Sequence, residues 1–367
     1  MTTWIEGKNP SLYDGGISAW LFDMLENCDI DELADSVLVV PAVLEKSIFP
    51  SLGLHEIKLP WVSEIPNKIN HVIYDWLTFR IASIRYKPDL VFSPYYDVRI
   101  SRKTPYVITI HDLCFLEVPE VYSRLQIFYF VRAMQRNIKR SIAIVTVSQT
   151  SKSAILSRFK VSSKKILVVP NQLNKDFDEF NPSPDEIHLF RRRLGDSEFN
   201  ILYTGGLENR KNIPNLLKGL NLLLQDYPDF QFCVTGQVTE KWEELLDQNS
   251  EIANKTVFLG HLTNQELKCA YISASVVVYP SLSEGFGRAC IEAMSTGTPL
   301  VCSDIPIFRE ISGDYAEYFQ PRDPNEIAKA LKNALGNGRK DRQAVRSPIS
   351  THEDLTQLRS ILFSRGL

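Results

Sequence analysis

Two glutamates, Glu284 and Glu292, stand eight positions apart on either side of a Gly-Phe-Gly turn at 285–287. The apolar run 275–281 predicts a strand before them, and the segment from Arg288 onward predicts a helix. The first glutamate then lies in the strand-to-helix loop and the second about one turn into the helix, so both carboxylates can line one cavity. Free N–H groups at a helix start favour a phosphate, and carboxylates accept hydrogen bonds from hydroxyl groups. Phosphate and hydroxyl groups together suggest a nucleotide that carries a sugar. The alternative, which an isolated pair of glutamates at this spacing favours, is a capping glutamate followed by a solvated one.

The turn TGGLENRKN (204–212) is a second candidate site. Gly205 follows a predicted strand, and Arg210 and Lys211 precede a predicted helix. Two adjacent cations at such a turn can clamp a diphosphate, arginine as a planar fork and lysine as a point charge. The alternative is a solvated basic turn. The sequence contains neither a P-loop nor a complete dinucleotide-binding G-x-G-x-x-G pattern.

Three other strand ends carry weaker candidates. Gly15 and Gly16 precede a predicted helix and would let a diphosphate approach the backbone, although such a pair is also a common structural turn. His111 ends a buried strand, where it can contact a ligand or serve as a core residue with its hydrogen bonds satisfied. Gly236 follows another strand. The histidines show no metal-ligand spacing and no Asp-x-Asp pair stands at a strand end, so we expect no metal site.

The composition is that of an ordinary soluble protein with two or three domains. The chain has 367 residues, 44% of them hydrophobic and 23% charged, and a net charge of −3 gives no basic field for nucleic acid. The six cysteines form no C-x-x-C pair, so reduced buried thiols are expected. Neither a signal peptide nor a membrane span is recognisable, which predicts a cytoplasmic protein.

The candidate residues belong to a repeated pattern of short apolar runs and longer amphipathic segments, which predicts parallel sheets covered by helices. The predicted strands are 2–7, 36–43, 88–94, 106–112, 143–149, 165–171, 200–206, 229–237, 255–261, 275–281 and 299–304. The predicted helices include 17–28, 65–86, 124–141, 150–159, 212–227 and 354–363.

A polar stretch with two prolines, 174–186, marks a linker between two doubly wound α/β domains. We expect one Rossmann-like domain at 1–180 and a second at 181–346. The final helix, within 347–367, is expected to pack back on the first domain. Ligands bind beyond the carboxyl ends of the strands in such sheets, so the predicted site is the cleft between the domains.

Taken together, these motifs resemble the retaining glycosyltransferases of family 4, which have the GT-B fold. The segments that carry the resemblance extend over nearly the whole chain: GGIS (15–18), HDL (111–113), VSQTSK (147–152), VVPN (168–171), GGLENRKN (205–212) and PSLSEGFGRACIEAMSTGTPLVCSD (280–304). Within the family the sequence is most similar to bacterial mannosyltransferases of polysaccharide, O-antigen and lipopolysaccharide assembly. Two positions depart from the family pattern: Arg288 stands where an apolar residue is usual, and Gln172 where glycine is usual.

The resemblance implies that the domain at 1–180 binds the acceptor and that the domain at 181–346 binds the nucleotide-sugar donor. It also implies a role for each matched residue. Glu292 would bind the ribose of the donor nucleotide, and Glu284 the hydroxyls of the donor sugar. Arg210 and Lys211 would neutralise the diphosphate leaving group, and His111 would contact the sugar near its 6-position. The remaining donor-binding positions are glycines that lie against the diphosphate, backbone that meets the phosphates, and loops that frame the base: Gly15, Gly16 and Gly205; Gly285, Phe286, Gly287 and Arg288; Gly236 and Leu262.

The implied reaction is a metal-independent, cofactor-free transfer of a hexose, with mannose from GDP-mannose as the expected donor. The acceptor would be a glycan or a lipid-linked saccharide. Two rival interpretations remain: a GT-B sugar-nucleotide epimerase and a non-catalytic nucleotide-sugar-binding protein. The basic, aromatic helix at 124–141 predicts peripheral contact with the inner face of the plasma membrane; the alternative is a helix packed only on its own sheet.

Overall fold

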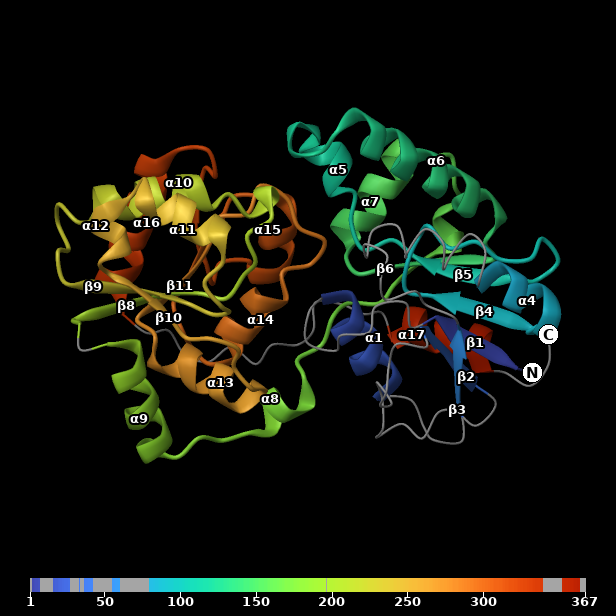
Figure 1. Cartoon of the computed structure of the whole chain (residues 1–367), viewed down its shortest axis with the longest axis horizontal. Helices are drawn as coiled ribbons and strands as arrows, with labels where there is room; N and C mark the ends of the chain where they lie inside the picture. Colours follow the sequence, from blue (N-terminus) through green and yellow to red (C-terminus); the bar gives the residue numbers. More distant parts are fainter. Residues whose placement is uncertain are drawn as a thin grey trace. The chain divides into compact units, whose positions relative to one another are not determined.

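The structure is a computed structural model, and it describes residues 2–6, 16–26, 33, 36–41, 55–59, 79–195, 197–338 and 352–363. The described residues form two compact units (Figure 1). The first contains the described residues up to Leu113, those from Tyr122 to Gln172, and the C-terminal helix. The second contains Cys114–Val121 and the described residues from Leu173 to Gly338. The short segment Cys114–Val121 thus belongs to the second unit although both of its flanks belong to the first.

The first unit is built on a parallel sheet, for which the described residues give seven strands in the order β3-β2-β1-β4-β5-β6-β7. Their bounds are β1 Thr3–Glu6, β2 Ser36–Pro41, β3 His55–Leu59, β4 Leu90–Ser93, β5 Tyr106–Thr109, β6 Ala143–Thr146 and β7 Ile166–Val168. Every residue of β1, β4, β5, β6 and β7 is buried, as expected for a parallel sheet covered on both faces. The strand order reverses between β1 and β4.

The second unit repeats this order, with six described parallel strands running β10-β9-β8-β11-β12-β13. Their bounds are β8 Phe199–Tyr203, β9 Phe230–Val234, β10 Thr256–Phe258, β11 Val276–Tyr279, β12 Leu300–Ser303 and β13 Glu317–Phe319. The order reverses between β8 and β11, whose register pairs Val276 with Ile201 and Val277 with Leu202. In doubly wound sheets this reversal opens a crevice at the carboxyl ends of the two strands, where ligands bind.

The described helices cover both faces of each sheet. In the first unit they are α1 Gly16–Glu26, α4 Arg80–Tyr86, α6 Arg124–Arg140, α7 Gln149–Arg158 and α17 His352–Phe363. In the second unit they are α5 Cys114–Glu117, α8 Lys175–Glu179, α9 Pro184–Leu194, α10 Ile213–Leu223, α11 Glu240–Asp247, α12 Ser250–Ala253, α13 Asn264–Ser273, α14 Arg288–Ser295, α15 Pro306–Ser312 and α16 Pro324–Asn337. Figure 1 shows α10 and α16 on one face of the second sheet, and α13 and α14 on the other.

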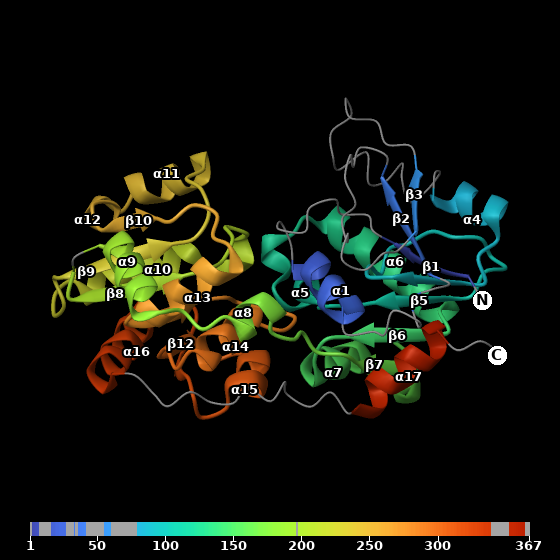
Figure 2. The same cartoon turned by 90° about the horizontal axis from the view of Figure 1, so that it is seen from below.

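The C-terminal helix α17 lies along β7 of the first unit (Figure 2). The Asp354 carboxylate accepts a hydrogen bond from the backbone of Val168 at 3.0 Å. The Leu362 carbonyl accepts one from the Thr3 hydroxyl at 2.7 Å, and the Leu362 side chain is buried. The chain therefore returns to the unit in which it begins. Among the described residues, no helix is long and apolar enough to cross a membrane.

Each strand predicted from an apolar run is present, so the predicted α/β class with two doubly wound parallel sheets is confirmed. Strands β3 and β13 were not predicted. The predicted linker is not uniformly irregular, because α8 and the start of α9 lie within 174–186. Helix α9 begins there because Ser183 and Glu186 form a reciprocal capping box around Pro184 at the first helical position. Of the helix predicted over 65–86, the part before 79 lies outside the described residues.

Candidate active site

The two main candidate segments meet at the strand-order reversal of the second unit. The loop 204–211 follows β8, the loop 280–287 follows β11, and these two strands are neighbours in the sheet. The backbone N–H of Leu282 donates to the Arg210 carbonyl at 2.8 Å, which joins the loops directly. Sequence segments more than seventy positions apart therefore form one site at the edge where such sheets bind ligands.

Two glycines in these loops are required by their surroundings. Gly287 has φ +94°, and a side chain there would bring its Cβ within 2.8 Å of the Phe308 ring. A Cβ at Gly205 would lie 2.3 Å from the Tyr203 hydroxyl, which donates to the Gly206 carbonyl at 2.7 Å. Both loops can therefore bring bare backbone to the crevice. Gly287 also precedes the first turn of α14, and the free backbone N–H groups of a helix start favour an anion.

Glu284 holds both cations of the neighbouring loop. Its Oε2 lies 2.6 Å from Arg210 Nη1, and its Oε1 lies 2.7 Å from Lys211 Nζ. The Ser281 hydroxyl donates to Oε1 at 2.8 Å. Burial alone would raise the pKa of this carboxyl, but Lys211 and Arg210, together with the hydrogen bonds from Lys211 and Ser281, outweigh burial and hold the pKa at about 2. Glu284 is therefore ionised throughout the physiological range.

Glu292 is held by a different set of partners. Its Oε1 accepts a hydrogen bond from Arg288 Nε at 3.1 Å, across one turn of α14, and its Oε2 accepts one from the Tyr271 hydroxyl at 2.9 Å. The side chain is buried. Arg288, which departs from the family pattern, is thus placed as an i, i+4 partner of Glu292.

Sequence reasoning missed the hydroxyl cluster behind Glu292. The Tyr271 hydroxyl lies 2.9 Å from that of Tyr279 and 2.9 Å from that of Thr204, and the latter two are 2.6 Å apart. Burial raises the pKa of both tyrosines well above their usual range, so their hydroxyls stay protonated. The available signal was weak: a buried tyrosine needs a polar partner, but the sequence does not say which. The cluster links Glu292 to the residue that precedes Gly205.

The other predicted residues of the second unit lie at neighbouring strand ends. Gly236, with φ +92°, donates its backbone N–H to the Gly260 carbonyl at 2.8 Å and so joins the ends of β9 and β10. Leu262, two residues after Gly260, is half-buried. Gly285 and Phe286 are buried. The contact of these residues with a base or a phosphate remains a prediction.

Two predicted residues lie in the first unit, and a third, Gly15, lies outside the described residues. Gly16 is the exposed first residue of α1, and a Cβ there would meet nothing within 4 Å. His111 Nε2 lies 3.1 Å from the Pro94 carbonyl. Because a carbonyl only accepts, this nitrogen carries the proton and Nδ1 keeps a lone pair. The ring of Trp20 meets that of His111 edge to face at 5.1 Å.

His111 makes the stability of the protein depend on pH. Burial lowers the pKa of its imidazole to about 4, against smaller opposing effects of Asp112 and the Pro94 hydrogen bond. The unfolded chain then binds a proton that the folded protein does not, so this contribution is complete above pH 6.5 and is lost as the pH falls toward 4. We expect up to about 3 kcal/mol of unfolding free energy to be lost over this interval.

Denaturant unfolding at several pH values, compared with His111→Gln, isolates that contribution from the carboxyl groups that also titrate in acid. The exposed His261 serves as the control, and His261→Gln should follow the wild-type profile. A His111→Gln profile parallel to that of the wild type between pH 6.5 and 4 would contradict the prediction.

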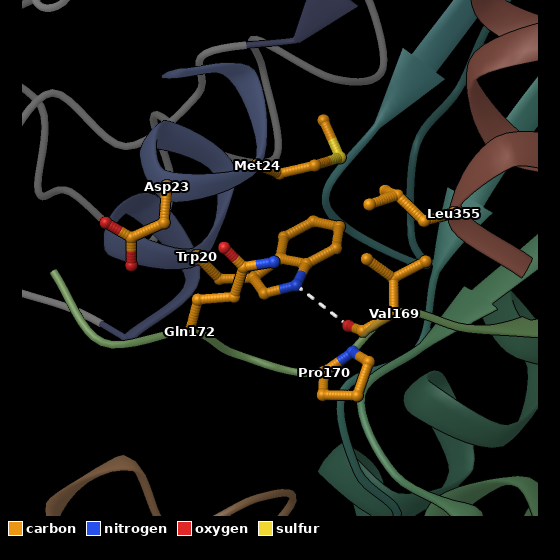
Figure 3. A pocket seen from close by; sticks show the side chains of 7 residues that line it. All are labelled: Trp20, Asp23, Met24, Val169, Pro170, Gln172 and Leu355. Carbon is orange, nitrogen blue, oxygen red and sulfur yellow. Dashed lines mark hydrogen bonds between the residues drawn. The ribbon is translucent and has the colours of Figure 1, made fainter. Parts of the chain in front are cut away.

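The first unit contains a small cavity (Figure 3). It is lined by Trp20, Asp23, Met24, Val169, Pro170, Gln172 and Leu355. The Trp20 indole N–H donates to the Val169 carbonyl at 3.1 Å. The cavity has a volume of about 10 Å³, which is room for one water molecule, so the cavity cannot hold a sugar nucleotide. Among the described residues, no group of three or more His, Cys, Asp or Glu side chains is placed to hold a metal ion.

The chain matches two family models. Residues 185–347 match the model described as glycosyl transferases group 1, and residues 40–177 match that of glycosyltransferase family 4. The O-antigen chain mannosyltransferase RfbU of Salmonella typhimurium is 27% identical over 325 residues, which cover 87% of each chain. The O-antigen chain mannosyltransferase B of Escherichia coli is 28% identical over 62% of this chain and 61% of its own.

Solved structures are similar over the whole length. WaaG, described as a glycosyltransferase involved in lipopolysaccharide biosynthesis, superimposes with a TM-score of 0.75 at 14% identity, covering 100% of both chains. HepE of Anabaena, solved in complex with UDP and glucose, superimposes with a TM-score of 0.67 at 16% identity, covering 99% of this chain and 96% of its own. These likenesses concern the fold.

Proposed function

Because this chain belongs to the group 1 and family 4 glycosyltransferases and has the GT-B fold, we propose that it transfers a hexose from a nucleoside diphosphate sugar to a saccharide acceptor. The donor we propose is GDP-mannose. Its support comes from the similar O-antigen mannosyltransferases of Salmonella typhimurium and Escherichia coli. The acceptor we propose is a glycan or lipid-linked saccharide of cell-surface polysaccharide assembly.

One observation carries the proposal: two carboxylates and two cations lie on the segments that follow the neighbouring strands β8 and β11. Arg210 and Lys211 supply positive charge for a diphosphate, and the start of α14 supplies backbone donors. Glu284 and Glu292 supply acceptors for hydroxyl groups on either side of that helix start. Such an arrangement suits a ligand with a sugar, a diphosphate and a ribose in sequence.

The proposed chemistry retains the anomeric configuration and uses no metal or cofactor. The bond between the anomeric carbon and the phosphate oxygen breaks, and its electron pair leaves with the diphosphate. Arg210 and Lys211 stabilise that charge in place of a metal ion. The acceptor oxygen attacks the anomeric carbon from the face that the diphosphate leaves, and its proton passes to the departing phosphate.

A panel of donors followed by NMR tests this function. GDP-mannose, UDP-glucose, UDP-GlcNAc, dTDP-rhamnose and GDP-fucose are incubated with the protein, with and without lipid-linked saccharide acceptors. We expect turnover of GDP-mannose that depends on the acceptor. Conversion of a donor to another sugar nucleotide without acceptor would instead indicate an epimerase. Binding without turnover on any acceptor would indicate a binding protein.

We further propose weak peripheral membrane contact through α6. One face of this helix exposes Arg124, Leu125, Phe128, Arg132 and Lys139, while Ala133, Met134 and Ile138 pack inward. Leu125 is 82% exposed and Phe128 61% exposed, beside cations that suit anionic lipid. Co-sedimentation with phosphatidylglycerol vesicles at low salt is expected, and Phe128→Ser should reduce it. A wild-type protein that stays in the supernatant would contradict this proposal.

A further inference from the structure

Glu284 forms ion pairs with Arg210 and Lys211, the two cations that are proposed to hold the diphosphate. Each carboxylate oxygen has its own cation, Oε1 with Lys211 and Oε2 with Arg210, at 2.7 and 2.6 Å. The side chains of all three residues are at most 20% exposed, so water stabilises their charges only weakly. Any anion that binds these cations must therefore share them with a carboxylate that is already there.

The balance of charge makes Glu284 and a bound diphosphate compete for Arg210 and Lys211. Two cations and one carboxylate leave a single net positive charge for a diphosphate. A buried carboxylate that loses its ionic partners without new hydrogen-bond donors is strongly destabilised. A bare nucleoside diphosphate brings phosphate oxygens, which are acceptors, and it lacks the donor sugar whose hydroxyls could donate to Glu284. An intact donor brings the same phosphates together with those hydroxyls.

We propose that Glu284 makes the site discriminate between the sugar-bearing donor and the bare nucleoside diphosphate, an inference that rests on the proposed donor class. Drawing Arg210 and Lys211 toward the phosphates loosens them from Glu284. The donor sugar compensates because its hydroxyls donate to the carboxylate. The product diphosphate offers no such compensation, so Glu284 regains its cations and the product is expelled. The carboxylate thus acts as a specificity-determining group that limits product inhibition.

Glu292 provides the internal comparison. It is buried in the same unit, but its partners are Arg288 and Tyr271 rather than the two cations of the 204–211 loop. Removing the charge of Glu292 therefore leaves Arg210 and Lys211 still bound by Glu284. If the discrimination comes from competition for those cations, it must depend on Glu284 and not on Glu292.

Isothermal titration calorimetry with GDP, GDP-mannose, UDP and UDP-glucose tests the inference. Wild-type protein should bind the donor of its preferred base several-fold more tightly than the matching bare diphosphate. Glu284→Gln, which removes one unit charge beside the phosphates, should bind the bare diphosphate roughly tenfold more tightly and the donor more weakly, so that the order reverses. Glu284→Ala should act in the same direction.

The control variant is Glu266→Gln, which removes a carboxylate charge from the same unit but away from the site. Glu266 pairs with Arg193 and caps α13, and glutamine keeps that capping box. Its four affinities should match those of the wild type. Glu292→Gln should weaken the binding of both the bare diphosphate and the donor, and the donor should still bind more tightly than the bare diphosphate.

Two results would overturn the inference. One is a wild-type protein that binds the bare diphosphate as tightly as the donor, a measurement that needs no variant to fold. The other is a Glu284→Gln protein, folded by its thermal unfolding curve, that binds the bare diphosphate no more tightly than the wild type. If the wild type binds none of the four nucleotides, the proposed function fails together with the inference. If the wild type binds them but either result above is found, only the inference fails.

Discussion

Replacing Lys211 by alanine should lower kcat by about 30- to 1,000-fold, equivalent to about 2–4 kcal/mol of transition-state stabilisation. The Lys211 ammonium is 2.7 Å from Glu284 Oε1, at the crevice where the diphosphate is proposed to leave. Negative charge accumulates on the leaving group as the glycosidic bond breaks, and Lys211 is one of two side-chain cations placed to meet it. Steady-state release of nucleoside diphosphate from the donor, at saturating donor and acceptor, measures the effect.

Two companion variants show whether charge at this position is responsible. Lys211→Arg keeps the charge and should recover part of the lost rate. Lys241→Ala removes an exposed cation of α11 whose ammonium contacts the Leu207 carbonyl and lies 2.9 Å from Asn209 Oδ1. It should leave kcat close to the wild-type value. Near-wild-type turnover by Lys211→Ala would refute the role of Lys211.

Replacing Glu292 by alanine should weaken the binding of the bare nucleoside diphosphate and of the full donor by the same factor. A hydrogen bond to a charged group is worth about 1.5–3 kcal/mol, which corresponds to roughly 10- to 150-fold in the dissociation constant. The reason is that the ribose, proposed as the partner of Glu292, is common to both ligands. Calorimetric titration of each ligand into the variant measures the two factors.

Tyr271→Phe is the matched control for Glu292, because it keeps the carboxylate and removes one donor that orients it, the hydroxyl at 2.9 Å. Its effect should be smaller and should again be equal for the two ligands. A Glu292→Ala protein that binds the donor poorly but the bare diphosphate normally would show that Glu292 contacts the sugar rather than the ribose.

The fold was largely predictable because its strands are buried on both faces. Runs such as Val276–Tyr279 are apolar without interruption, which distinguishes them from the amphipathic helices around them. The two strands that were missed, β3 and β13, stand at the outer edges of their sheets. Both strands contain charged residues, in His55–Leu59 and Glu317–Phe319, as edge strands often do. Neither is therefore an uninterrupted apolar run.

The candidate site was predictable as a set of loops but not as a set of contacts. Strand ends located Arg210, Lys211 and Glu284 at the same edge of a sheet. Their direct pairing depends on β8 lying beside β11, and strand order is a tertiary property. The Arg288–Glu292 pair, in contrast, follows from a four-residue spacing on one helix and could have been predicted.

The hydroxyl cluster behind Glu292 contains fewer hydrogens than contacts. Thr204, Tyr271 and Tyr279 each have one hydroxyl hydrogen. Their hydroxyls make four contacts no longer than 2.9 Å, one to the Glu292 carboxylate and three among themselves. With the Tyr271 hydrogen directed to the carboxylate, two hydrogens remain for three oxygen–oxygen contacts, so one contact joins two lone pairs. The cluster is therefore short of one hydrogen. A ligand group that donates to Glu292 Oε2 in place of Tyr271 would free the Tyr271 hydrogen for the third contact, so the cluster favours a donor at Glu292 over an acceptor.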